Sequence, residues 1–245
     1  MFMLKRHNLD YLILAGAILL NLGVWFNSSP RLPEWANVPP APSTVGATAS
    51  FLGDAELAYR SLALTLQSFG NDTGQVQALK DYNYENLGTW FDLTDHLNPH
   101  SDYVPFLAGY YFGGSQDPSK LMPVIQYLRR VGTYPEADKW RYLGQAVFLA
   151  YHKMKNPELA LELADELAKT YKPGMPAWPL QMKAILASKM GEKEMAYNMM
   201  LDAIQNKKEG LDPIEINYMV DQICNHILTP EQRKTNPLCE NQKPW

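Results

Sequence analysis

The chain has 245 residues, a formal net charge of −4 and 2 cysteines, and 46% of its residues are hydrophobic. This composition excludes a disulfide-stapled miniprotein, a collagen and an acidic disordered chain, and it fits one ordinary globular domain with an additional segment. Binding nucleic acid phosphates requires a surplus of lysine and arginine, which this chain lacks, so we expect no nucleic acid partner.

The first 26 residues are far more apolar than the rest of the chain. No charged residue occurs from Tyr11 to Phe26, and about 17 to 25 apolar residues in a helix span the hydrocarbon of a bilayer. Lys5 and Arg6 precede this segment, and basic residues favour the cytoplasmic side. We therefore expect residues 1–26 to form a cytoplasmic stub and a single-pass anchor in a bacterial inner membrane. Residues 9–26 would contact the lipid bilayer, and the remainder of the chain would be periplasmic.

A cleaved signal peptide is the alternative interpretation of this segment. Signal peptides end in a small-x-small cleavage site, whereas the first such site here is at residues 47–49 and the apolar segment ends in Trp25 and Phe26. Asn21 is a polar group at membrane depth, and Gly16 and Gly23 share a helical face, so the helix is suited to forming an oligomer. Small residues that are merely tolerated are the alternative.

Residues 27–50 contain five prolines among serine, threonine, alanine and valine. No periodic apolar face is present, and such a composition favours an extended spacer of about 3 Å per residue, with a reach of roughly 70 Å. We expect a tether here, with recognition by a partner as the alternative. The folded domain would then comprise residues 51–245.

From residue 51 onward, apolar residues recur at three-residue and four-residue spacing, which predicts helices and almost no strands. Turn residues such as glycine, proline and asparagine separate these helices. The first runs from Asp54 to Gly70, and the others are expected over residues 84–97, 102–112, 118–131, 137–154, 157–171, 177–190, 192–207 and 213–226. Short connections between helices of this length predict antiparallel hairpins that must stack to bury their apolar faces, so the fold class is all-α.

One part of the chain resembles the tetratricopeptide repeat, in which small residues let two helices approach closely. The residues that carry the resemblance are Leu180, Ala184, Ala187, Gly191, Ala196, Met200 and Ala203, and a similar but longer pattern starts at Trp140. The resemblance covers roughly residues 102–207. It implies an α-solenoid whose concave groove binds a protein or peptide segment. The positions expected to face that groove are Asp102, Asp138, Arg141, Gln145, Trp178 and Gln181.

Motifs for catalysis are weak. Asp92, Asp95 and His96 form the densest acid–base group, but Pro99 ends their helix, so His96 and His100 do not form a helical metal pair. Nucleophile elbows, phosphate loops and dinucleotide-binding runs are missing from the sequence. We expect no catalytic site, no metal site and no cofactor.

Cys224 and Cys239 are the only cysteines. In an exported domain they would form a disulfide that closes a loop of about 15 residues, and two free thiols are the alternative. The expected function is a membrane-anchored extracytoplasmic scaffold or adaptor in an envelope complex. The alternatives are a hydrolase that processes an envelope polymer around Asp92, Asp95, His96 or Glu85, and an accessory subunit permanently built into a larger membrane complex.

Overall fold

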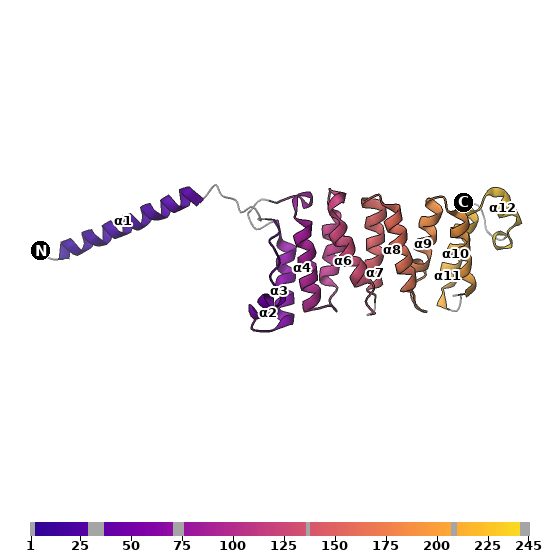
Figure 1. Cartoon of the computed structure of the whole chain (residues 1–245), viewed down its shortest axis with the longest axis horizontal. Coiled ribbons are helices and arrows are strands. Elements are labelled where there is room, and N and C mark those ends of the chain that lie inside the picture. Colours follow the sequence, from indigo (N-terminus) through magenta and orange to yellow (C-terminus); the bar gives the residue numbers. More distant parts are fainter. Residues whose placement is uncertain (1–2, 29–36, 71–75, 136–137, 207–209, 241–245) are drawn as a thin grey trace.

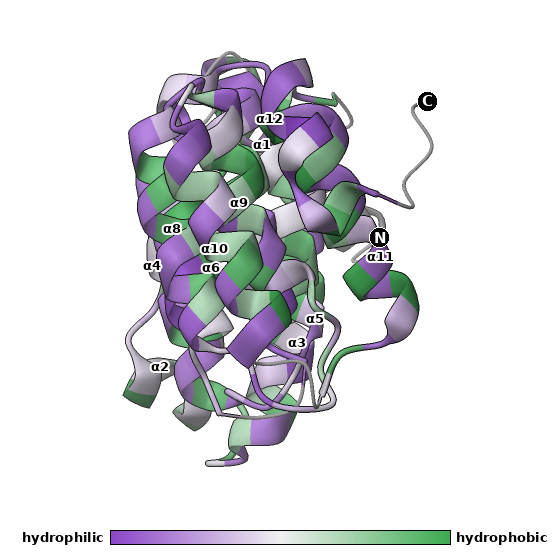
Figure 2. Ribbon diagram, turned by 90° about the vertical axis from the view of Figure 1, so that its right-hand side faces the viewer, coloured by the Kyte–Doolittle hydropathy of each residue, from purple (hydrophilic) through white to green (hydrophobic). Residues whose placement is uncertain are grey.

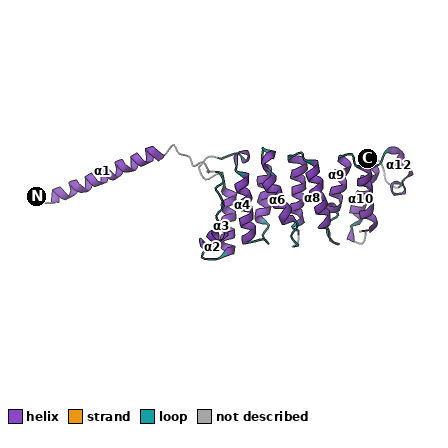
Figure 3. Cartoon of the chain, in the orientation of Figure 1, coloured by secondary structure: helices purple, strands orange, loops and turns teal. Residues whose placement is uncertain are grey.

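The computed structural model describes residues 3–28, 37–70, 76–135, 138–206 and 210–240. Within these ranges the chain forms helices, turns and loops and contains no strand (Figure 3). The predicted all-α fold class is thereby confirmed. Seen along the row of helices (Figure 2), the elements overlie one another, with apolar and polar turns mixed on each helix.

The first helix, α1 (Met3–Ser28), contains the predicted apolar segment (Figure 1). Its window Asp10–Asn27 has a mean hydropathy of 1.4, and none of it is buried inside the structure. By length and composition α1 can cross a membrane, and a signal sequence near the N-terminus meets the same criterion.

The second half of the expected tether is part of the folded domain. Val38 is 1% exposed, and its carbonyl accepts a hydrogen bond of 2.9 Å from the Asn86 side chain. The indole nitrogen of Trp90 donates to the Pro39 carbonyl at 2.8 Å, and residues 44–49 form the short helix α2 (Thr44–Ala49). Prolines lack an N–H but keep a good acceptor, so a proline-rich segment docks readily through its carbonyls. The remaining expected tether residues 29–36 lie outside the described ranges.

The helices beyond α2 follow one another in a row along the length of the molecule (Figure 1). In chain order they are α3 (Ala55–Ser68), α4 (Tyr84–Leu97), α5 (Tyr103–Phe106), α6 (Met122–Gly132), α7 (Trp140–Phe148), α8 (Pro157–Lys169), α9 (Trp178–Lys189), α10 (Lys193–Asn206), α11 (Pro213–Gln222) and α12 (Pro230–Thr235). Contacts join α3 to α4, α4 to α6, and then each helix from α6 to α11 to the next one. Three of these helices, α5, α7 and α11, continue as π-helical turns over Leu107–Tyr111, Leu149–Lys153 and Ile223–Ile227.

Two helix starts differ from the expected boundaries, and both differences have a backbone cause. Residues Pro118–Lys120 form a 3₁₀ turn, and α6 begins only at Met122, which places Pro123 in the first turn where its missing N–H costs nothing. Helix α7 begins at Trp140 rather than Ala137, because Asp138 has a φ of 68° and a left-handed residue cannot belong to a right-handed helix.

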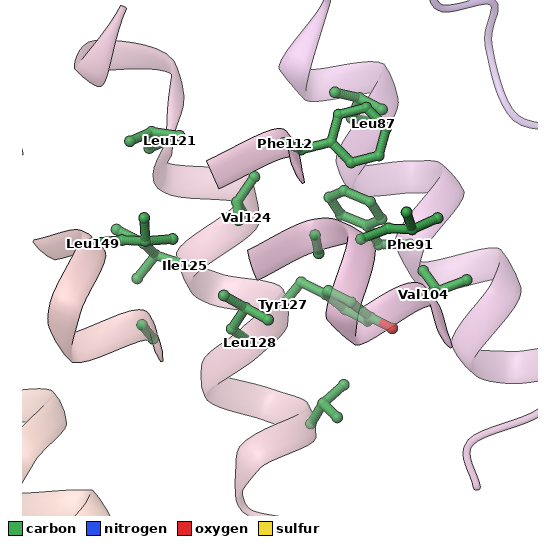
Figure 4. Close-up of a cluster of buried hydrophobic side chains, with 14 of the residues drawn as sticks. Leu87, Phe91, Val104, Phe112, Leu121, Val124, Ile125, Tyr127, Leu128 and Leu149 are labelled. Carbon is green, nitrogen blue, oxygen red and sulfur yellow. The ribbon is translucent and has the colours of Figure 1, made fainter. Parts of the chain in front are cut away.

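The core runs along the row between neighbouring helices. Phe91 and Tyr127 stack with their ring centroids 4.9 Å apart, and Leu87, Phe112 and Leu128 close the cluster around them (Figure 4). Glycines allow close approach of consecutive pairs. A Cβ on Gly132 would lie 2.4 Å from the Leu143 Cβ, so α6 and α7 meet backbone to backbone.

The C-terminal end of the row is closed by a disulfide. Cys224 and Cys239 are bonded, with their Cα atoms 5.7 Å apart, which confirms the predicted pair. The bond joins the π-helical turn Ile223–Ile227 to the 3₁₀ turn Pro237–Cys239, with α12 between them. Because disulfides persist in oxidising compartments, this bond agrees with a domain outside the cytosol.

Candidate functional site

The row has two sides, and one of them is built from the first helix of each successive pair. These first helices are α3, α5, α7, α9 and α11, with their π-helical continuations, and neighbours along this side are in direct contact. The Tyr103 hydroxyl donates to the Gln67 amide oxygen between α5 and α3, and the Tyr142 hydroxyl donates to the Asp102 carbonyl at 3.1 Å between α7 and α5. We call the exposed side chains of these helices the first-helix face.

The second helices, on the other side, are α4, α6, α8 and α10, and ion pairs join α4 to α6 and α6 to α8. Arg129 on α6 pairs with Glu162 at 2.6 Å and with Glu166, both on α8. The hydrogen bonds that the Arg129 guanidinium donates to Glu166 and Glu162 raise its pKa. From α4 to α8 this side of the row therefore carries ion pairs.

Exposed apolar side chains gather on the first-helix face. Within α3 to α11 and the turns that continue them, large hydrophobic residues that are exposed belong to first helices, with Met195 on α10 as the exception among described residues. They are Leu57, Leu64, Tyr103, Phe106, Tyr110, Tyr111, Phe148, Ile214 and Tyr218. Phe106 and Tyr110 pair with ring centroids 4.9 Å apart. Residue type alone does not distinguish such an exposed aromatic face from a core face.

Asp102, the first of the predicted groove positions, lies at the start of α5 and partners a buried lysine. The Lys139 side chain is 1% exposed, and its Nζ lies 3.0 Å from the Asp102 Oδ1. The same ammonium donates to the Ser101 carbonyl at 2.7 Å. Burial, and then the neighbouring Asp102 carboxylate, raise the pKa of Tyr142 beside this pair. Lysine is rarely buried, so no pattern in the sequence pointed to Lys139.

Asp138 and Arg141 are exposed and form a pair 3.5 Å apart at the start of α7. The Arg141 guanidinium also lies 5.5 Å from the centre of the Trp140 ring. Asp138 and Trp140 contribute to a cavity of about 650 Å³, whose other walls include Tyr134, Tyr171 and Met175. This cavity opens beside the loops that join the pairs.

Gln145 is half-buried and bridges two first helices. Its Nε2 donates to the Gly109 carbonyl at 3.1 Å, and a Cβ on Gly109 would lie 2.9 Å from the Gln145 Cγ. The amide therefore satisfies a carbonyl of the π-helical turn Leu107–Tyr111, which ties α7 to α5.

Trp178 and Gln181 lie together on α9. The Trp178 ring packs over Gly144 of α7, with its centroid 4.9 Å from that of Trp140, and Gln181 is 6% exposed. Both residues line a cavity of about 520 Å³ between α9 and α11. The six predicted positions thus all lie on first helices or at their starts; Asp102, Asp138 and Arg141 are exposed, whereas the other three are partly or mostly buried.

Asp92 and Asp95, the carboxylates of the predicted acid–base group, form contacts that join α4 to α6 and the residues that follow it. Arg130 lies 2.6 Å from the Asp92 Oδ1 and 3.6 Å from the Asp95 Oδ2. The Tyr134 hydroxyl donates to Asp95 at 2.6 Å, and burial together with this hydrogen bond raises the Tyr134 pKa. Among described residues, no group of three histidine, cysteine or acidic side chains is placed to hold a metal ion.

No protein-family model matches the chain, and neither a curated protein nor a solved structure matches it.

Proposed function

We propose that this protein is a membrane-anchored extracytoplasmic scaffold or adaptor that binds a protein or peptide partner in an envelope complex. Helix α1 is the anchor with its N-terminus in the cytoplasm, and the row of helices is a tetratricopeptide-like α-solenoid on the periplasmic side. The partner contacts the first-helix face. The observation that carries the proposal is the segregation of exposed apolar side chains onto that face.

The physical reason is the cost of leaving such a surface in water. Exposed apolar side chains scattered singly are normal, but a contiguous set on one side of a molecule marks an interaction surface. Aromatic residues also dominate the binding energy of protein interfaces. Tyr103, Phe106 and Tyr110 follow each other at three-residue and four-residue spacing, so they share one side of a helical segment.

The location of the domain is supported by two independent features. Helix α1 is long and apolar enough to span a bilayer, and the Cys224–Cys239 disulfide requires an oxidising environment. A bacterial periplasm provides that environment directly beyond the inner membrane. A fusion of alkaline phosphatase to the C-terminus tests this orientation, since the enzyme is active only when exported.

Photocrosslinking along the row tests the function. We expect benzoylphenylalanine at Phe106 or Phe148 to crosslink one protein repeatedly in intact cells. The matched control is the same probe at Gln126, which is exposed on α6 of the opposite side. Equal crosslinking from Gln126, or none from either first-helix position, would contradict the proposal.

Substitution tests the same face by a second route. Phe106→Glu should abolish co-purification of the crosslinked protein from solubilised membranes, whereas Gln126→Glu should leave it unchanged. Exchange with an added tagged copy of the protein then separates the two forms of the proposal. A transient adaptor exchanges its partner within minutes, and a permanently built-in subunit does not exchange it.

A further inference from the structure

Neighbouring first helices are bridged by side chains along most of the row. Between α3 and α5 the Tyr59 hydroxyl donates to the Ser101 hydroxyl at 2.6 Å. Gln145 reaches from α7 to the π-helical turn after α5, and Trp178 of α9 fills the space above Gly144 of α7. Each of these three gaps is therefore closed by the protein itself.

The gap between α9 and α11 is bridged at the start of α9, where the Ala177 N–H donates to the Glu215 carboxylate at 2.6 Å, and beside this bridge it contains a cavity of about 520 Å³. We call this cavity the α9–α11 pocket. Its lining consists of Trp178, Gln181, Met182 and Ile185 from α9 and Ile214, Glu215 and Tyr218 from α11. Pockets that hold small ligands or single side chains have volumes of about 300 to 1,000 Å³, so the space is of a suitable size.

The walls of the pocket are suited to an apolar group. Ile214 is 77% exposed and Tyr218 is 44% exposed, which leaves two large side chains without cover at the mouth. Met182 adds a flexible thioether that adapts to different shapes. The only charged group in the lining is Glu215, and its carboxylate already accepts hydrogen bonds from the backbone N–H of Ala177 at 2.6 Å and of Asp212 at 3.3 Å.

Gln181 is the exception in this apolar lining. The residue is 6% exposed, and its side-chain amide makes no hydrogen bond to any part of the chain that the structure describes. A primary amide has both donors and an acceptor. The Gln181 amide is not among the buried side-chain groups that lack a partner, so it faces the solvent of the pocket, and a ligand that enters must replace the hydrogen bonds of that solvent. A peptide group presents one N–H and one carbonyl, which can take the place of that solvent.

We propose that the α9–α11 pocket binds one bulky apolar side chain of the partner segment and that Gln181 pairs with the adjoining peptide group. This site rests on the proposed function and specifies its chemistry: the partner presents an aromatic or large aliphatic residue in a segment whose backbone is accessible. The pocket anchors the segment at the α11 end of the first-helix face.

Methyl NMR on the full chain in lipid nanodiscs tests the site with defined probes. The probes are N-acetyl-phenylalaninamide, which has the ring and two peptide-like groups, and toluene, which has only the ring and its first carbon. We expect saturable shifts of the Met182, Ile185 and Ile214 methyl signals with both probes, at a Kd of about 1 mM for the amide. The signal of the Met195 methyl on α10 should not shift with either probe.

Two variants separate the hydrogen-bonding role of Gln181 from the apolar role of the pocket, and a third variant is the control. Gln181→Leu keeps the side-chain volume and removes the hydrogen bonds. It should therefore weaken binding of the amide probe about tenfold and leave binding of toluene unchanged. Ile214→Asp at the mouth should abolish the response to both probes. Leu64→Asp, at an apolar site on α3 that is 62% exposed, should change neither response.

Three outcomes would overturn the proposal. The first is the absence of saturable shifts at the pocket methyls, and the second is a Gln181→Leu variant that binds both probes like the native chain. The third is a pocket occupied by lipid, seen as shifts that depend on acyl chain length and do not respond to either probe. Any of these, together with intact crosslinking from Phe106, would reject the pocket and leave the proposed function standing.

Discussion

At the scale of single residues, glycines set how closely the pairs approach. A Cβ on Gly144 would lie 2.2 Å from the Trp178 Cη2, inside any allowed contact distance. We expect Gly144→Ala to lower the free energy of unfolding by about 1–3 kcal/mol, because an overpacked core must shift its backbone or leave its rotamers. Urea titration followed by circular dichroism measures the loss.

The partner residue provides the control for this prediction. A Trp178→Leu variant lacks the ring atom that would clash. In that variant Gly144→Ala should lower the free energy of unfolding far less than it does in the native chain. The gain of helix propensity from glycine to alanine, roughly 1 kcal/mol, can even reverse the sign there. Equal losses in both backgrounds would show that the ring is not what Gly144 accommodates.

At the scale of elements, the disulfide holds the C-terminal cap on the row. Replacing Cys224 and Cys239 by serine removes a cross-link that closes 15 residues. In the chain-entropy model such a loop is worth about 3 kcal/mol, and we expect hydrogen exchange to accelerate over residues 229–239 while α4 and α6 keep their protection. A reductant should reproduce this pattern in the native chain and have no effect on the double variant.

Helix α1 has a polar side chain, Asn21, within the part that is long and apolar enough to cross a membrane. Asn21 lies near the middle of the window Asp10–Asn27, next to Ala17, Ile18 and Trp25 in a shallow notch of the helix surface. We expect two copies to pair through their Asn21 amides, since an unpaired amide in hydrocarbon is costly and an amide is complementary to itself. Asn21→Leu should weaken self-association in membranes by about 0.6–2 kcal/mol.

Two controls accompany the Asn21 prediction. Asn21→Gln keeps the amide and should preserve association, as measured by energy transfer between labelled copies. Gly16→Leu and Gly23→Leu alter the opposite side of the helix and should have little effect. If the glycine variants dissociate the pair and Asn21→Leu does not, the helices associate through the glycine face instead.

At the scale of the whole molecule, the sequence predicted helices better than surfaces. The helix Tyr84–Leu97 was predicted with its observed bounds, because Asn83 caps its start and Asn98 precedes a proline at its end. Apolar periodicity likewise located the later pairs. Local patterns decide such features, and they are visible in one chain.

Long-range placement was not predictable in the same way. The docking of Val38 depends on Asn86 and Trp90, which lie 48 and 51 residues further along the chain from their acceptors. The unpaired state of the Gln181 amide, and the cavity beside it, depend on how far α11 stands from α9. Periodicity identifies which helices have a buried side, but contacts between distant elements decide which apolar residues remain exposed.

With α1 as the proposed anchor, the docking of Val38 and Pro39 on α4 also limits the distance between the membrane and the start of the helical domain. Only the residues between Ser28 and Asn37 connect α1 to the docked segment. A chain of that length spans at most roughly 30 Å when fully extended. In that arrangement the start of the row, where Val38 and Pro39 dock on α4, lies within about one bilayer thickness of the lipid surface, rather than at the roughly 70 Å that an undocked tether would allow, and α11 lies at the far end of the row (Figure 1). Under the proposed function, a partner that contacts the α3 end of the row is then close to the lipid surface, so the search for it begins among proteins of the same bilayer.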